Sequence, residues 1–268
     1  MDHDEAGRPG GAGARGATDR ADLAPGAARH LLGDKTALGE VDPRTIDPPY
    51  DAPGYRSSTR RSPRHPLLVL PPSVAERAGP LLGEGRVGPL DHDLTRQHPG
   101  EPIGERIVVE GRLSDGDGRP IAGQLIELWQ ANAAGRYAHH VDDHRAPLDP
   151  NFSGTGRCVT GPDGRYRFVT IRPGEYPWGN HHNAWRPAHL HFSVFGRAFV
   201  DRLVTQMYFP GDPLFAYDPI FNSVNDPIAR QAMVAAFDLR LTEPAFALGY
   251  RFDIVVGGPR PTPLEDER

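Results

Sequence analysis

Short runs of alternating apolar and polar residues begin near residue 105 and predict a succession of β-strands. Asp-Gly pairs at 115–116, 117–118 and 163–164 are typical of the tight turns that join such strands. One segment, 227–241, instead carries apolar residues at helical spacing, and it predicts a helix. Because strands and helices do not alternate regularly, the pattern favours an all-β, two-sheet β-sandwich with long loops and few short helices. The predicted strands are 105–115, 121–131, 165–173, 188–196, 203–209 and 250–258.

The chain before residue 101 has a different composition from the predicted sandwich of residues 101–260. Residues 1–40 begin with a stretch rich in Gly, Ala, Asp and Arg, and they predict a disordered tail. Residues 41–100 are rich in proline and predict an extended N-terminal arm with a short helix at 71–80. Residues 261–268 predict a C-terminal tail.

Two segments inside the predicted sandwich, 132–156 and 174–187, show little strand pattern. Both are dense in Tyr, His, Trp and Arg, which is not typical of disordered segments. Long loops in a compact domain are usually functional or disordered. We therefore expect these two loops to carry the active site.

Composition and charge limit the classes of function. The net charge of −5 and the lack of a basic stripe argue against general nucleic-acid binding. No apolar run approaches the ~18 residues of a membrane span. Cys158 is the only cysteine, so a disulfide framework and a Cys-rich zinc site are excluded; we expect it to be a small buried thiol in a strand. The N-terminus lacks a basic segment followed by an apolar one, so we expect no signal peptide and a cytoplasmic protein.

The segment AHLHFSVFG places His189 and His191 on one face of a strand, about 6–7 Å apart. This spacing allows both imidazoles to bind one metal ion. Tyr137 and Tyr176 lie in the flanking loops, and a phenolate is a hard, anionic donor that suits Fe(III). A site with two histidines and one carboxylate is the alternative. The carboxylates available for it are Asp142, Asp143, Asp149 and Glu175.

The spacing Y-x38-Y-x12-H-x-H, within WQANAAGRYAHH, APLDPNFSGTGRC, PGEYPWGN and NAWRPAHLHF, resembles the intradiol ring-cleaving dioxygenases. The match is closest to the iron-bearing β subunits that act on protocatechuate, and it runs from about residue 55 to residue 258. The resemblance implies cleavage of protocatechuate with O2 to 3-carboxy-cis,cis-muconate. It also implies a homologous α subunit that completes the pocket. The implied non-haem Fe(III) ligands are Tyr137, Tyr176, His189 and His191.

The same resemblance implies roles for further residues. Tyr176 would also be catalytic, because its phenolate would leave the iron and accept a proton from the substrate. Arg186 would stabilise the anionic catecholate, and Gln206 would form hydrogen bonds beside it. The implied substrate-binding residues are Tyr55, which would contact the carboxylate, and the pocket walls Trp129, Trp178 and Ile220. The remaining clustered histidines, at 139, 140, 144, 181 and 182, are expected to be surface residues.

Three alternatives remain at this stage. The first is a related intradiol enzyme for catechol or hydroxyquinol, although those enzymes carry a long helical N-terminal region that this chain lacks. The second is a β-sandwich binding module without enzymatic activity. The third is an Fe(II) or zinc hydrolytic site built from His189, His191 and a carboxylate.

Overall fold

The computed structural model describes residues 47–65, 87–179, 184–195 and 202–264. The predicted tail at 1–40 and the predicted helix at 71–80 lie outside the described residues. The described residues belong to one compact unit of the chain, Gly39–Arg268. The predicted domain boundaries at 40, 100 and 260 stay predictions.

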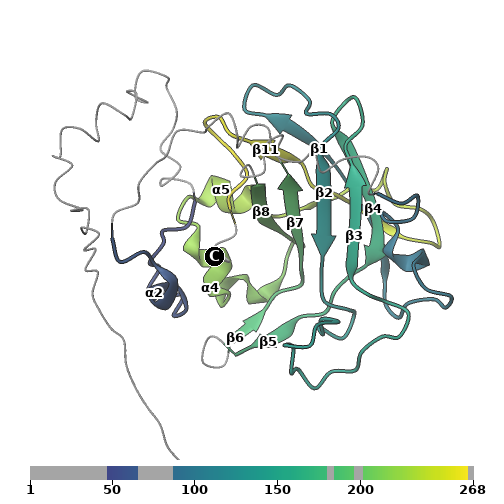
Figure 1. Cartoon of the computed structure of the whole chain (residues 1–268), viewed down its shortest axis with the longest axis horizontal. Coiled ribbons are helices and arrows are strands. Elements are labelled where there is room, and N and C mark those ends of the chain that lie inside the picture. Colours follow the sequence, from purple (N-terminus) through teal and green to yellow (C-terminus); the bar gives the residue numbers. More distant parts are fainter. Residues whose placement is uncertain (1–46, 66–86, 180–183, 196–201, 265–268) are drawn as a thin grey trace, which may run out of the picture. The chain divides into compact units, whose positions relative to one another are not determined.

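Two β-sheets form the body of the structure (Figure 1). In the first sheet, β1 (Arg106–Asp115) pairs antiparallel with β4 (Arg165–Ile171). It also pairs in parallel with β10 (Leu248–Arg251) and then with β11 (Ile254–Val256), while β9 (Ala236–Phe237) pairs with β10. The second sheet is antiparallel, in the order β3 (Thr155–Val159), β2 (Leu125–Trp129), β7 (His189–Phe195) and β8 (Arg202–Tyr208). The predicted all-β fold is confirmed.

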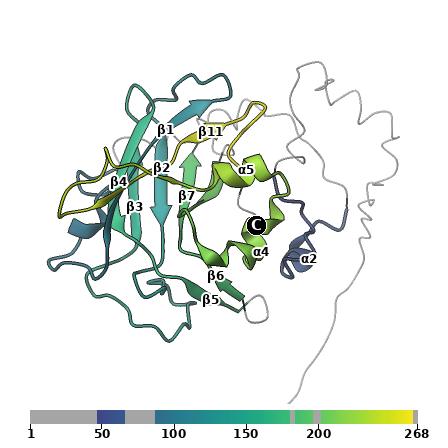
Figure 2. The ribbon, with the colours of Figure 1, turned by 180° about the vertical axis from the view of Figure 1, so that it is seen from behind.

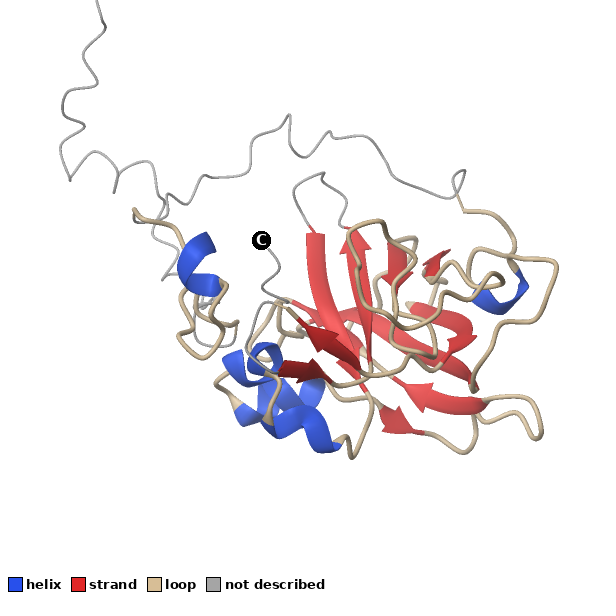
Figure 3. Cartoon of the chain, turned by 90° about the horizontal axis from the view of Figure 1, so that it is seen from below, coloured by secondary structure: helices blue, strands red, loops and turns tan. Residues whose placement is uncertain are grey.

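The helices of the described chain are short. They are α2 (Ser58–Arg61), α4 (Pro219–Ser223) and α5 (Pro227–Ala232), with 3-10 turns at Leu94–Arg96 and Pro213–Ala216. The opposite views in Figures 1 and 2 place α4 and α5 on the β7–β8 side of the second sheet, and Figure 3 shows most of the helical segments on one side of the strands. In the described part of the chain, no helix has the length and apolarity to cross a bilayer.

The hydrophobic core lies between the two sheets. Val109 of β1 and Phe168 of β4 belong to the same buried cluster as Leu190, Phe192 and Val194 of β7. The rings of Phe168 and Phe192 meet edge to face, with centroids 6.0 Å apart. Alternate residues of β7 therefore fill the core, as the sequence predicts, and the intervening positions carry the two histidines.

Two predicted elements are corrected by the structure. The predicted strand 250–258 divides at Phe252 because the Asp253 side chain, and not a ladder carbonyl, accepts the Arg112 backbone N–H at 2.8 Å. At the same place the Phe252 carbonyl lies so close to Gly111 that a Cβ there would come within 1.7 Å of it. The strand predicted at 121–131 is shorter, Leu125–Trp129.

The helix predicted over 227–241 is wrong beyond residue 232. The Tyr208 backbone N–H donates to the Met233 carbonyl at 2.8 Å, and the Ala235 N–H donates back to Tyr208 at 2.9 Å. Sheet pairing therefore satisfies the backbone groups that a continuing helix would have to satisfy internally. The helical spacing does not mark a buried face either, because Ile228 and Phe237 are 61% and 50% exposed.

Candidate active site

The two histidines of β7 form the centre of the site. His189 and His191 are 2% and 3% exposed, and their ring centroids are 4.8 Å apart. The His189 Nδ1–H donates to the Pro187 carbonyl at 2.7 Å, which leaves the Nε2 lone pair available. Burial, followed by the nearby Arg186 cation, holds the pKa of His189 well below its usual value. The ring is therefore neutral, as a metal ligand has to be.

Two phenol hydroxyls lie against these imidazoles. The Tyr137 hydroxyl is 2.9 Å from His191 Nε2, and the Tyr176 hydroxyl is 3.3 Å from His189 Nε2. The two phenol rings are also in edge-to-face contact, with centroids 5.4 Å apart. Two hard phenol oxygens and two imidazole nitrogens thus converge on one place, a donor set that fits a trivalent iron ion.

The two tyrosine loops meet at a glycine. The Asn132 side chain accepts the backbone N–H groups of residues 134 and 136, and this folds the turn that precedes Tyr137. Gly135 has φ +76°, and a Cβ there would lie 2.2 Å from the Glu175 carbonyl. Because that carbonyl immediately precedes Tyr176, the close approach at Gly135 brings both tyrosine loops together.

A two-stranded hairpin sets the positions of Tyr176 and Arg186 relative to each other. β5 (Tyr176–Trp178) pairs with β6 (Ala184–Arg186), with Tyr176 opposite Arg186. The Arg186 Nη1 lies 3.5 Å from the Tyr176 hydroxyl. Sequence reasoning treated 174–187 as a loop, so it missed the hairpin that sets this contact.

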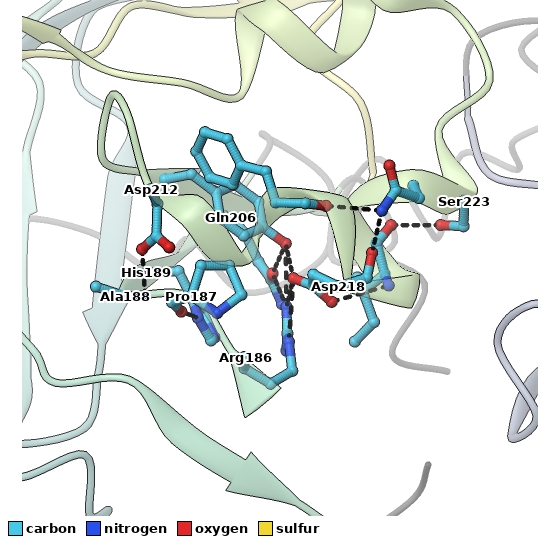
Figure 4. A network of polar contacts seen from close by, with 12 residues as sticks. Arg186, Pro187, Ala188, His189, Gln206, Asp212, Asp218 and Ser223 are labelled. Atoms are coloured by element: carbon cyan, nitrogen blue, oxygen red, sulfur yellow. Dashed lines mark hydrogen bonds and ion pairs between the residues drawn. The ribbon is translucent and has the colours of Figure 1, made fainter. Parts of the chain in front are cut away.

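Arg186 is 1% exposed and lies in a buried polar network (Figure 4). Its Nη2 donates to Gln206 Oε1 at 2.6 Å, to the Tyr208 hydroxyl at 3.0 Å and to Asp218 Oδ2 at 3.1 Å. Sequence reasoning missed Tyr208 and Asp218. The Asp-Pro pair at 218–219 signals a helix start, but it does not indicate a distant arginine.

Aromatic and apolar groups surround these polar residues. Trp129 of β2 stacks on His191 with ring centroids 4.7 Å apart. Tyr55 and Ile220 share a buried cluster against which Trp178 packs. The Arg186 guanidinium lies 5.9 Å from the Trp178 ring and connects this cluster to the donor atoms. Every predicted site residue therefore contacts at least one other: Tyr55, Trp129, Tyr137, Tyr176, Trp178, Arg186, His189, His191, Gln206 and Ile220.

A pocket of about 560 Å³ opens beside the donor atoms. Its walls include Trp129, Tyr137, Tyr176 and His191, and Val141 at its edge is 70% exposed. This volume is sufficient for a small aromatic molecule. Of the predicted substrate-binding residues, Trp129 lines this pocket, whereas Tyr55, Trp178 and Ile220 do not.

The carboxylate alternative finds no support in the described residues, which contain no group of three or more His, Cys, Asp or Glu able to hold a metal ion. Asp142 is engaged elsewhere, since it accepts the backbone N–H of Tyr137 at 2.7 Å. Of the five other histidines in the cluster, 139 and 140 are exposed, 144 is half-buried, and 181 and 182 lie outside the described residues.

Comparisons with known proteins agree with this geometry. A family model described as Dioxygenase matches residues 78–258, and one described as Protocatechuate 3,4-dioxygenase beta subunit N terminal matches residues 42–73. The protocatechuate 3,4-dioxygenase beta chain of Burkholderia cepacia is 57% identical over 220 residues, covering 81% of this chain and 93% of that one. The hydroxyquinol 1,2-dioxygenase of Rhizobium sp. (strain MTP-10005) is 34% identical, covering 56% of this chain and 53% of that one. The protocatechuate 3,4-dioxygenase alpha chain of Burkholderia cepacia is 31% identical, covering 61% and 78%.

Proposed function

Because the chain belongs to the intradiol dioxygenases, and among them to the protocatechuate 3,4-dioxygenase beta chains, we propose that it cleaves protocatechuate with O2 to 3-carboxy-cis,cis-muconate. The observation that carries this proposal is the pair of tyrosine–histidine contacts at 2.9 and 3.3 Å on one end of β7. The similarity to the beta chain over 93% of its length supports the choice of substrate over catechol or hydroxyquinol.

Tyr137, Tyr176, His189 and His191 would hold the non-haem ferric ion. The phenol oxygens, once deprotonated, would offset two of its positive charges, and the two imidazoles would complete the set. When bound, the ion supplies a Lewis acid that draws electron density from a chelated catechol. The Pro187 carbonyl keeps the His189 Nε2 directed at the site by accepting the Nδ1–H.

Tyr176 would accept a proton from the substrate, and Arg186 would stabilise the negative charge that develops on it. The Tyr176 side chain, as a phenolate, would accept a proton from the catechol as the substrate binds and would become a neutral phenol. Arg186 holds its Nη1 3.5 Å from that oxygen, so its positive charge lies where negative charge builds up on the substrate. Gln206 accepts from Nη2 at 2.6 Å and keeps the guanidinium from rotating.

The cluster of Tyr55, Trp178 and Ile220, which does not line the 560 Å³ pocket, would bind the substrate ring and its carboxylate. Trp178 and Ile220 form apolar walls, and Tyr55 offers its hydroxyl to the carboxylate. The Arg61 side chain donates to that hydroxyl and lies 5.0 Å from the Tyr55 ring. The added positive charge suits a substrate that carries a carboxylate on its ring.

A homologous α subunit would cover the open side of the pocket. The similarity of this chain to a curated alpha chain supports a partner built on the same family.

The test is co-expression of the full chain with a protocatechuate 3,4-dioxygenase alpha chain, followed by oxygen-uptake assays on protocatechuate, catechol and hydroxyquinol. We expect a red-brown visible absorption band and the fastest uptake with protocatechuate. A colourless, iron-free complex without uptake would contradict the proposal. Uptake only with catechol or hydroxyquinol would contradict the choice of substrate.

Tyr176→Phe separates the roles of the phenol. We expect the variant to keep most of its iron and to bind protocatechuate at least 10-fold more slowly, because the proton acceptor is lost. Tyr217→Phe is the matched control, since the Tyr217 side chain is 73% exposed and lies outside the predicted site. Loss of most of the iron, with normal binding kinetics in the fraction that keeps it, would show that Tyr176 serves only as a ligand.

A further inference from the structure

Three Asp-Pro pairs begin the short helices that follow β8. Asp212, Asp218 and Asp226 each accept the backbone N–H two residues later, at 2.9, 3.0 and 2.7 Å. All three therefore act as N-caps. Capping uses one carboxylate oxygen, so the second oxygen is available for another function.

In Asp218 the second oxygen contacts Arg186. Asp218 is 0% exposed, and its Oδ2 accepts from Arg186 Nε at 3.3 Å and from Nη2 at 3.1 Å. The Tyr208 hydroxyl lies 3.2 Å from the same oxygen and also donates to Gln206 Oε1. Figure 4 shows Asp218 and Gln206 at the end of the Arg186 side chain.

One edge of the Arg186 guanidinium is fixed by buried polar groups, and its remaining nitrogen faces the predicted metal ligands. Nε and Nη2 point to Asp218, Tyr208 and Gln206, while Nη1 points to the Tyr176 hydroxyl at 3.5 Å. Arginine presents its donors in a rigid fork, so fixing one edge fixes the direction of the remaining nitrogen. A buried cation also needs a nearby anion to offset its desolvation.

We propose that Asp218, together with Tyr208, is a positioning residue that aims Arg186 at the Tyr176 oxygen. This inference rests on the proposed function, because it gives Arg186 its direction during catechol cleavage. Asp218 also caps α4, whose Ile220 lies in the predicted substrate wall. The Asp218 carboxylate therefore contacts Arg186 and also fixes the start of the helix that carries Ile220.

The main test is Asp218→Asn in the full chain co-purified with the alpha chain. Asparagine caps helices as well as aspartate does, so α4 keeps its cap and only the charge is lost. We expect kcat for protocatechuate to fall 10- to 100-fold with KM changed less than threefold. The matched control is Asp226→Asn, the same change at the half-buried cap of α5, which should leave kcat within twofold of wild type.

A double-mutant cycle with Arg186→Gln shows whether Asp218 affects kcat through Arg186 or through the stability of the fold. If Asp218 acts through Arg186, Asp218→Asn should change kcat less than threefold once Arg186 is already replaced. A further 10-fold loss in that background would overturn the proposal, as would an Asp218→Asn variant with wild-type kcat. If Asp218→Asn does not fold, Tyr208→Phe tests the positioning role instead, because the Tyr208 hydroxyl contacts both Arg186 and Asp218. It should lower kcat several-fold at constant KM, and a wild-type kcat would refute the role.

Failure of the proposed function gives a different result. If the wild-type complex takes up no oxygen with any of the three catechols, the proposed reaction fails. The positioning role is then decided by crystal structures of iron-free wild type and Asp218→Asn. We expect Arg186 Nη1 to move away from the Tyr176 hydroxyl in the variant, and an unchanged Arg186 would overturn the inference.

Discussion

Replacing Gly135 with alanine tests whether the contact between the two tyrosine loops sets the site. A Cβ at residue 135 would lie 2.2 Å from the Glu175 carbonyl oxygen. Non-bonded heavy atoms are most stable about 3.5 Å apart, so the loops would have to separate by roughly 1 Å. The left-handed φ of +76° adds about 1–2 kcal/mol for alanine, and overpacking adds about 1–3 kcal/mol. A shift of this size in the hydroxyl groups should lower kcat by about 100-fold.

Gly118→Ala is the matched control. Gly118 has φ +80°, but a Cβ there would meet nothing within 4 Å, so only the backbone strain is added. Thermal unfolding and oxygen uptake should be measured on both variants as complexes with the alpha chain. We expect Gly118→Ala to lose about 1–2 kcal/mol of stability and to keep its kcat. If Gly135→Ala matches Gly118→Ala in both measurements, the loop contact does not position the tyrosines.

Three further results are expected. Burial raises the pKa of Cys158 to about 12, so a thiol reagent at pH 8 should label it only after unfolding; rapid labelling of the native chain would contradict its burial. Trp129→Leu removes the ring stacked 4.7 Å from His191 and should lower the iron content of the purified protein, measured by metal analysis. Unchanged iron content would show that the stacked ring does not help to hold His191 in place. Arg186→Met leaves Asp218 buried without its cation and should lower the free energy of unfolding, measured by chemical denaturation, by about 3–5 kcal/mol. Adding Asp218→Asn should recover part of that loss, and purely additive losses would show that the two residues are not coupled.

Patterns within short segments of the sequence were sufficient for much of the fold. The alternation in 188–196 predicts both the core face of β7, with Leu190 and Phe192, and the opposite positions of the two histidines. Side chains on a strand alternate between faces whatever the rest of the chain does, so a local pattern determines which residues share a face. The spacing of Tyr137, Tyr176 and the two histidines, through the resemblance it carries, also led to the candidate ligands.

Elements that depend on a distant partner were not predictable in this way. The segment after Met233 has helical spacing, yet it pairs with Tyr208 because backbone groups there find carbonyl and N–H partners in the sheet. Asp218 looks like an ordinary helix cap in the sequence, and only the tertiary structure brings Arg186, 32 residues earlier, to its second oxygen. Local patterns were thus sufficient for most strands of the two sheets and for the core face of β7, and the resemblance supplied the candidate ligands. The tertiary structure decided which buried charges are paired, because pairing depends on a distance in space that no local pattern encodes.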